Sequence, residues 1–299
     1  MFIIRHRKLF VSISGILVFL SILSISFWGL NLGIDFKGGA ITEVSYNSGR
    51  PDIEIIKENI NGLGIGGFNI QPSGESNFII RTKFLDENEK PELLKAVSLS
   101  ENDALIIRYS DIGPVIGSEL RQKTIIAIFI VIISIIVFIA LAFRHISEPV
   151  SSWKYGLIAI ITLAHDVIIP TGIFSALGHF YGKEIDILFV TAILSIFGIS
   201  INDTIVIFDR IRENLKYNKE HHHRENFGDV VGKSLDQTFI RSFNTSFATL
   251  LVLASLFFLA GVSTENLILA LLLGQIFGTY SSLFLASPLL VIWSGERGK

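Results

Sequence analysis

The sequence contains no cysteine among its 299 residues. This absence excludes disulfides, catalysis by a thiol and metal sites with cysteine ligands. Charged residues are also scarce, at 17%, and the formal net charge is only −2. A chain this close to neutral has no general basic field that would attract nucleic acid, so we expect no nucleic-acid partner.

The motifs of several enzyme classes are missing as well. There is no HExxH motif of the metalloprotease type and no phosphate-cradling loop, which argues against ATP as the energy source. Ser175, Ser195 and Ser200 have no His–Asp arrangement that would make a hydrolase. Three imidazoles at 221–223 can bind metal, but neighbouring residues point in different directions, so we favour a solvated loop. We therefore expect no enzymatic activity, no cofactor and no metal.

Apolar residues, by contrast, are abundant. They make up 50% of the chain, and the mean hydropathy of +0.56 is typical of integral membrane proteins. The first long apolar run follows three basic residues, is longer than a signal-peptide core and lacks an Ala-x-Ala cleavage site, so we interpret it as a retained anchor. Six apolar segments are long enough to span a membrane: about 9–30, 120–143, 155–177, 185–208, 239–260 and 266–292.

The distribution of lysine and arginine predicts the orientation of these spans. With six spans, both termini and the loops after the second and fourth spans lie on one side. The short loops on the other side, 179–184 and 261–266, hold only Lys183. The positive-inside rule therefore makes both termini cytoplasmic and places 31–119 outside. The basic residues on the cytoplasmic side are Arg5, Arg7, Lys8, Arg144, Lys154, Arg210, Arg212, Lys216, Lys219, Arg224, Lys233, Arg297 and Lys299.

The outside segment has the pattern of a folded domain. Alternating apolar residues and turn chemistry at 72–75 predict strands over 41–46, 67–71, 78–83 and 104–109, with helices over 51–61 and 89–98. The order β-α-β-β-α-β matches the ferredoxin-like unit. The expected fold is a membrane all-α bundle of six transmembrane helices with a small α+β ferredoxin-like extracytoplasmic domain.

The domain boundaries follow from these segments. Residues 1–30 form the cytoplasmic tip and first transmembrane helix, and 31–119 form the extracytoplasmic domain. Residues 120–293 form five transmembrane helices with a cytoplasmic loop at 209–236, and 294–299 form a cytoplasmic tail. The fourth helix is expected to continue past the membrane through 209–217.

Asp203 is the most informative residue. An ionisable side chain within a span costs several kcal/mol and usually marks a functional site facing the bundle interior or a wet cavity. Asn202 and Thr204 flank it, and the fifth span begins at a compatible depth with Arg241 and a polar run that includes Thr245. These five residues are our proton-coupling candidates. A structural Asp203–Arg241 ion pair between two helices is the alternative.

The physical argument for proton coupling rests on two opposing effects. Burial disfavours an ionised carboxylate, whereas a nearby guanidinium favours it. A site where the two effects nearly balance can gain and lose a proton when its hydration or geometry changes. A potential of about 100 mV adds roughly 2.3 kcal/mol per proton, so small rearrangements suffice for coupling.

Asp166, preceded by His165 in the third span, is a second intramembrane acid and a further proton-coupling candidate. Adjacent residues do not share a helix face, so we expect the two side chains to point apart. The pattern leaves open a proton relay and a polar helix–helix contact. In the sequence NLGIDFKGG at 31–39, Asp35 with Lys37 is interpreted as a local turn pair rather than a site.

Five motifs in order resemble the SecF family of bacterial protein-translocase accessory subunits. They are NLGIDFKGG at 31–39, GPVIGSEL at 113–120, LAHD at 163–166, SINDTIVIFDRIRENL at 200–215 and SLDQTFIRSFNTSFATL at 234–250. The resemblance covers nearly the whole chain. Residues 219–228, KEHHHRENFG, depart from the family pattern through a longer loop.

The resemblance implies a function. SecF is similar to half of a resistance–nodulation–division transporter, pairs with SecD and acts beside the SecYEG channel, drawing unfolded preproteins outward with the proton-motive force. The family's essential acid falls on Asp203 and its arginine on Arg241. The implied location is the bacterial plasma (inner) membrane, with lipid as the surrounding partner. Half of a small-molecule exporter of the same superfamily and a structural scaffold of the translocon are the alternatives.

Overall fold

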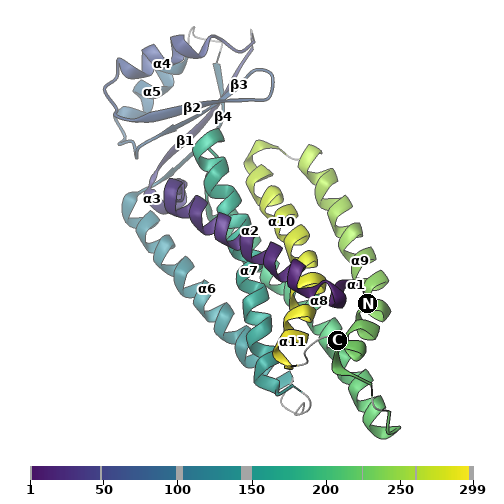
Figure 1. Cartoon of the computed structure of the whole chain (residues 1–299). Helices are drawn as coiled ribbons and strands as arrows, with labels where there is room; N and C mark the ends of the chain where they lie inside the picture. The colour runs from purple at the N-terminus through teal and green to yellow at the C-terminus, as the bar shows by residue number, and fades with distance from the viewer. Residues whose placement is uncertain are drawn as a thin grey trace. The chain divides into compact units, whose positions relative to one another are not determined.

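The computed structural model describes residues 2–47, 49–98, 104–142, 150–223, 225–259 and 261–295. They divide into two compact units (Figure 1). The small unit is Leu32–Ile126, and the helical unit joins the chain up to Asn31 to the chain from Ala127 onward. The elements in chain order are α1 (Phe2–Arg5), α2 (Arg7–Trp28), α3 (Ile34–Lys37), β1 (Gly39–Tyr46), α4 (Ile53–Asn61), β2 (Phe68–Ser73), β3 (Asn77–Thr82), α5 (Glu89–Val97), β4 (Ala104–Ile112), α6 (Pro114–Ala142), α7 (Ser152–Tyr181), α8 (Ile187–Glu220), α9 (Phe227–Leu259), α10 (Val262–Ser281), η1 (Ser282–Ala286) and α11 (Ser287–Trp293).

The small unit is a four-stranded sheet with two helices. Its expected strands and helices all form, in the expected order, and all neighbouring strands are antiparallel in the order β2-β3-β1-β4. In the central strand β1, Ile41 lies opposite Arg81 of β3 and Ser110 of β4. The helices α4 and α5 contact each other and cover one face (Figure 1). The hydrophobic core between the sheet and these helices includes Val44, Ile56, Ile60, Phe78, Ile80 and Leu93.

The start of α4 and the segment before β1 differ from the prediction. Helix α4 begins at Ile53 rather than at 51, because Asp52 is its N-cap and accepts a hydrogen bond from the Glu54 amide at 3.0 Å. The short helix α3, which the sequence did not predict, occupies the region of Asp35 and Lys37.

Gly38, Gly39 and Gly117 form a glycine joint where α3, β1 and α6 meet inside the small unit. Gly38 and Gly39 have φ values of 77° and 144°, which favour glycine. A Cβ atom on Gly38 would lie 2.8 Å from Pro114 Cα, and one on Gly117 would lie 2.8 Å from the Gly38 nitrogen. Side chains are therefore excluded where the start of α6 meets the start of the sheet.

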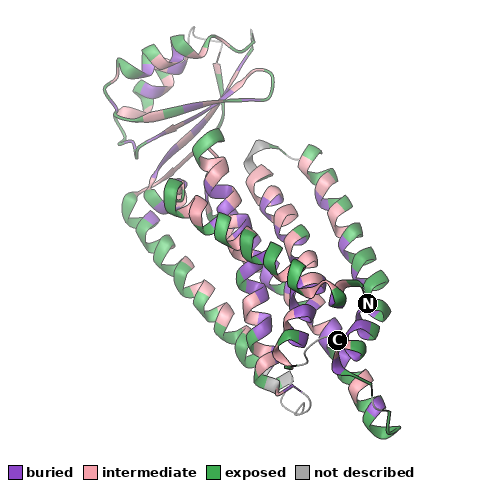
Figure 2. Ribbon diagram, in the orientation of Figure 1, coloured by how far each residue is buried: buried purple, intermediate pink, exposed green. Residues whose placement is uncertain are grey.

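The helical unit contains the remaining apolar segments. Across the described residues, six helices are long and apolar enough to cross a membrane, in agreement with the six predicted spans. The buried share is largest in α7 and next largest, equally, in α8 and in the span from α10 to α11, whereas α2, α6 and α9 are mostly exposed (Figure 2). A polar residue is therefore most strongly shielded from lipid in these three spans.

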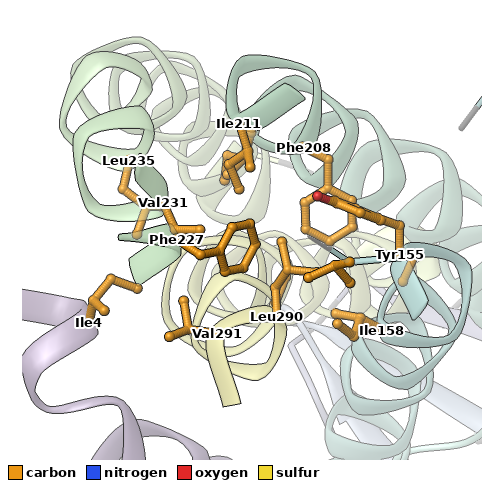
Figure 3. Packing of buried hydrophobic residues seen from close by; sticks show 14 of the residues in the cluster. Ile4, Tyr155, Ile158, Phe208, Ile211, Phe227, Val231, Leu235, Leu290 and Val291 are labelled. Atoms are coloured by element: carbon orange, nitrogen blue, oxygen red, sulfur yellow. The ribbon is translucent and has the colours of Figure 1, made fainter. Parts of the chain in front are cut away.

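The predicted loop 209–236 is instead helical over most of its length. Helix α8 continues to Glu220, as expected, and α9 already begins at Phe227 rather than near 239. The early start of α9 is stabilised by packing, because Phe227, Val231 and Leu235 are buried against Ile211 in one apolar cluster (Figure 3). Ile4, Leu290 and Val291 belong to the same cluster, so both ends of the described chain lie at this end of the bundle.

The sixth apolar segment is not a uniform helix. The helix α10 passes through a π-helical turn, η1, into α11. Pro288, at the start of α11, lacks an N–H group, and its ring would crowd the carbonyl of Phe284 in a regular helix. Because Phe284 lies in η1, the extra residue of the π turn relieves that conflict, and such turns are frequent at functional sites.

Candidate proton-coupling site in the helix bundle

Asp203 lies on α8 at a cavity between helices. The side chain is half-buried, and its Oδ2 accepts a hydrogen bond from Ser246 Oγ of α9 at 3.4 Å. The cavity has a volume of about 480 Å³. Its lining residues are Ser195, Gly198, Ile199, Asn202, Asp203, Thr245, Ser246, Thr249 and Gln275.

Helical periodicity brings these side chains together. Positions 195, 198, 199, 202 and 203 are spaced by three and four residues, so they share one face of α8. Thr245, Ser246 and Thr249 supply the facing surface of α9, and Gln275 of α10 contributes from the third side. The result is a cavity around the Asp203 carboxylate that is lined mostly by polar side chains.

The structure does not bring Arg241 into ionic contact with Asp203. In the described part of the chain no ion pair links the two side chains, and Arg241 is exposed. Its carbonyl accepts a hydrogen bond from Thr245 Oγ1 at 2.8 Å. Arg241 precedes Ser246 by five residues, about 7.5 Å along a helix axis. The hydroxyl of Ser246, rather than the guanidinium, is thus the observed partner of the carboxylate.

Of the candidates Asn202, Thr204 and Thr245, only some lie at the cavity beside Asp203. Asn202 and Thr245 are exposed and line the cavity beside Asp203. Thr204 is buried on another side of α8, where its Oγ1 lies 3.0 Å from Ser282 Oγ at the start of η1. Thr204 therefore takes part in helix packing around the π turn, and not in the cavity.

Asp166 on α7 is fully buried, with 0% of its surface exposed. Its Oδ1 lies 2.8 Å from His165 Nδ1, and its Oδ2 accepts hydrogen bonds from Ser281 Oγ at 2.8 Å and from Ser200 Oγ. The expectation that adjacent side chains would point apart is wrong for this pair, because the imidazole lies within hydrogen-bond distance of the carboxylate. Asp166 thus links α7 to α8 and α10.

Sequence reasoning did not single out Ser281, Ser282 or Gln275. A weak signal existed in the sixth segment, where small residues at 274 and 278 precede two serines. A Cβ atom on Gly278 would lie 3.4 Å from Ser200 Cβ and 3.7 Å from Asp166 Oδ2. The small residue lets α10 approach α8 closely enough for Ser281 to reach the carboxylate.

The other motifs supply no ligand cluster. Across the described ranges, no group of three His, Asp or Glu side chains is placed to hold a metal ion. The rings of His221 and His223 stack on Tyr217 with centroid separations of 4.1 and 6.2 Å. His221 Nδ1 also lies 3.0 Å from the Tyr217 carbonyl oxygen. These rings therefore cap the end of α8.

Two family profiles match the chain. The SecD/SecF GG motif matches residues 24–49, which include Gly38 and Gly39 of the glycine joint. The C-terminal region of the SecD/SecF protein export membrane proteins matches residues 93–296, which include all the residues of the cavity.

Individual proteins and structures agree with these profiles. The protein translocase subunit SecF of Thermobaculum terrenum is 36% identical over 98% of this chain and 94% of its own length. The SecF of Haemophilus influenzae is 36% identical over 94% of this chain and 82% of its own length.

The crystal structure of SecDF, a translocon-associated membrane protein from Thermus thermophilus, matches 98% of this chain with a TM-score of 0.85 and 29% identity. SecDF in a super-membrane-facing form matches with a TM-score of 0.69 and 30% identity. This chain spans 38% of the length of each of these SecDF chains. It belongs to the SecD/SecF family of protein export membrane proteins.

Proposed function

We propose that this chain is a proton-motive-force-driven accessory subunit of the Sec protein-export machinery. It acts with SecD beside the SecYEG channel and promotes the passage of unfolded preproteins across the plasma membrane. It is not an enzyme, and it takes its energy from protons. The observation that carries the proposal is Asp203, a carboxylate held within a membrane helix at a polar cavity.

The surroundings of Asp203 suit both of its protonation states. When the carboxylate is ionised, the Ser246 hydroxyl donates to it. When it is protonated, its O–H can donate to the hydroxyl or amide oxygens of Thr245 or Asn202, which line the same cavity. A carboxylate with partners in both states can gain and lose a proton without leaving a buried polar group unpaired.

Arg241 provides the second state of the cycle. A shift of α9 by about one and a half turns' length would carry the guanidinium toward Asp203 and favour the ionised form. We therefore assign one state with Asp203 protonated and Arg241 distant, and another with the two side chains paired. Moving one charge through a potential of about 100 mV supplies roughly 2.3 kcal/mol, which is enough to bias such an equilibrium strongly.

SecD is the partner that would complete the unit. The exposed face of α9 carries Phe239, Phe243 and Phe247, whose rings stack in series with centroid separations of 6.1 and 5.9 Å. The cavity adjoins the same helix. The match of this chain to part of a SecDF chain supports a relationship with SecD.

The orientation follows from the basic residues. Because the loops on one side hold only Lys183, we place both termini in the cytoplasm and the small unit outside the plasma membrane. The sheet order β2-β3-β1-β4, antiparallel throughout, supports a ferredoxin-like fold for that extracytoplasmic domain.

Replacement of the carboxylate tests the proposal. In membrane vesicles that contain the complete translocase, Asp203→Asn should assemble normally and lose the export stimulation that depends on a proton gradient. Asp209→Asn, six residues further along α8 and largely exposed, is the matched control and should keep this stimulation. Full stimulation in Asp203→Asn would overturn the proton-coupling role.

A structural scaffold is the competing function. A scaffold role predicts a stable ion pair between Asp203 and Arg241. Among the described residues, no ion pair joins these two side chains. A charge exchange, Asp203→Arg with Arg241→Asp, should preserve a packing pair but abolish a tuned proton site. Retained stimulation in that double variant would favour the scaffold.

A further inference from the structure

His165 and Asp166 form a buried polar dyad that the Asp203 cycle does not use. His165 is 2% exposed and Asp166 is 0% exposed, and they join through His165 Nδ1 and Asp166 Oδ1 at 2.8 Å. In the described part of the helical unit no lysine or arginine pairs with this carboxylate. A buried carboxylate without a basic partner must be balanced by hydrogen bonds or by a proton.

His165 also lines a cavity that is different from the one at Asp203. His165 Nε2 is buried and has no hydrogen-bond partner among the described residues. His165 lines a cavity of about 330 Å³ between α2, α7 and the segment around η1, together with Ser14, Val18 and Leu285. This cavity shares no lining residue with the one at Asp203.

Among the described residues, no other charged side chain pairs with this dyad. The titratable side chain packed on His165 is Tyr280 of α10, whose ring lies 6.0 Å from the imidazole at 20°. Its hydroxyl donates to the Phe10 carbonyl oxygen at 3.2 Å. The residues that α2 and α8 present here, Ser14 and Ser200, carry no charge.

We propose that His165 and Asp166 form a second proton-binding site, which receives its proton from the cavity between α2 and α7 and signals its occupancy to Ser281 at the π-helical turn. The inference rests on the proposed function, because a second proton site has a use only in a proton-driven bundle.

Proton uptake by the dyad takes two steps. A proton from the cavity binds Nε2 of neutral His165, and the Nδ1 proton passes to Asp166 Oδ1. The imidazole is left neutral with its proton on Nε2, and the carboxylate becomes a neutral acid. The dyad gains one proton, its charge changes from −1 to zero, and release reverses the steps.

Ser281 connects this proton to the helix packing. Its hydroxyl hydrogen has two acceptors within reach, Asp166 Oδ2 at 2.8 Å and the Gly278 carbonyl oxygen at 3.0 Å. An ionised Asp166 is the stronger acceptor, whereas a neutral acid competes less well. Protonation therefore moves the Ser281 hydrogen to Gly278 and weakens the contact between α7 and the end of α10.

The π turn can pass this change in hydrogen bonding on to the packing of α8. Ser282, the next residue and the first of η1, bonds to Thr204 Oγ1 at 3.0 Å and to the Ser200 carbonyl oxygen at 3.5 Å on α8. A π turn carries one extra residue that a helix can absorb or shift. The dyad can thus bias the packing of α10 and η1 against α8, the helix that bears Asp203.

Infrared difference spectroscopy of the full-length protein in lipid vesicles tests the site without any export assay. Over a pH titration, the wild type should show a protonated-carboxyl band that Asp166→Asn removes and Asp203→Asn leaves in place. Identical carboxyl bands in the wild type and Asp166→Asn would overturn the proposal. Loss of export in Asp203→Asn is scored separately, so failure of the proposed function and failure of this inference are distinguishable.

Two further variants keep Asp166 and so guard against misfolding of Asp166→Asn. Ser281→Ala should shift the frequency of the Asp166 band, and an unshifted band would contradict the link to η1.

After a pH jump, His165→Gln should slow the appearance of the band by about a hundredfold, as expected when a positioned proton carrier is lost. His179→Gln, a histidine change at the far end of the same helix, is the matched control and should leave the rate unchanged. An unchanged rate in His165→Gln would contradict the route through the imidazole.

Discussion

Ser246 of α9 donates a hydrogen bond to the Asp203 carboxylate of α8 across 3.4 Å, and Ser246 itself is 3% exposed. The acid of the fourth span is thereby tied to the fifth span through a hydroxyl that can reorient. An arginine in this position would hold the carboxylate ionised, whereas a serine leaves it free to accept a proton.

Removal of this hydroxyl should weaken coupling. Ser246→Ala takes away the donor to ionised Asp203, a loss of about 1 kcal/mol, so we expect gradient-dependent export to fall by about fivefold. The measurement is export by vesicles at matched protein levels. Ser255→Ala, whose hydroxyl donates to the Leu251 carbonyl oxygen of the same helix, should have no effect. Equal losses in both variants would indicate general destabilisation of α9.

A methyl group added at Gly172 should destabilise the contact between α2 and α7. A Cβ atom on Gly172 would lie 2.8 Å from the Ser21 carbonyl oxygen, so Gly172→Ala forces the two helices apart. We expect a loss of about 1 to 3 kcal/mol in stability, seen as a lower thermal unfolding midpoint in detergent. Gly15→Ala on α2 is the control, because a Cβ atom there would meet nothing within 4 Å. An unfolding midpoint unchanged by Gly172→Ala would contradict this packing.

The glycine joint of the small unit gives a parallel prediction. In Gly117→Ala, the new methyl group would approach the Gly38 nitrogen to 2.8 Å, and backbone atoms cannot swing away as a flexible side chain can. We expect about 1 to 3 kcal/mol of destabilisation, measured by faster proteolysis within 32–126. Gly67→Ala, which meets nothing within 4 Å, should leave the cleavage rate as it is.

The connection between α8 and α9 should depend on pH through Glu225. A hydrogen bond from Asn218 Nδ2 at 2.9 Å, aided by the Lys233 ammonium at 3.6 Å, holds the pKa of Glu225 below its usual value. A lowered folded-state pKa means that the stabilisation is present above the unfolded-state pKa and is lost as the pH falls through the folded-state pKa, below about pH 4.

Hydrogen exchange checks this dependence. Protection of the first turn of α9, which starts at Phe227, should fall over that acid range in the wild type. In Glu225→Gln the same protection should be lower at neutral pH and show no such step. Glu220→Gln, at the exposed end of α8, serves as the control. A step that persists in Glu225→Gln would assign the pH dependence to another group.

Much of this architecture could be predicted from the sequence because it is encoded locally. Long apolar runs gave the six spans, and alternating residues with turn chemistry at 72–75 gave the strands of the small unit. The start of α9 at Phe227 was missed because its first turns are amphipathic and become helical by packing on Ile211.

The candidate site was predictable only in part. Asp203 stood out because a charge in an apolar run is visible in one dimension. Its contact with Ser246 rather than Arg241 depends on the rotation and axial offset of two helices, which no local pattern encodes. The convergence of Ser200 and Ser281 on Asp166 likewise requires three helices to be placed together.

The central claim is that Asp203 carries the proton that drives export. It is tested most directly by the slope of export rate against the size of an imposed proton gradient, measured in vesicles with the complete translocase. We predict that the rate rises with the gradient in the wild type, and that Asp203→Asn keeps its gradient-independent rate with a slope of zero. A slope in Asp203→Asn equal to that of the wild type would contradict the account.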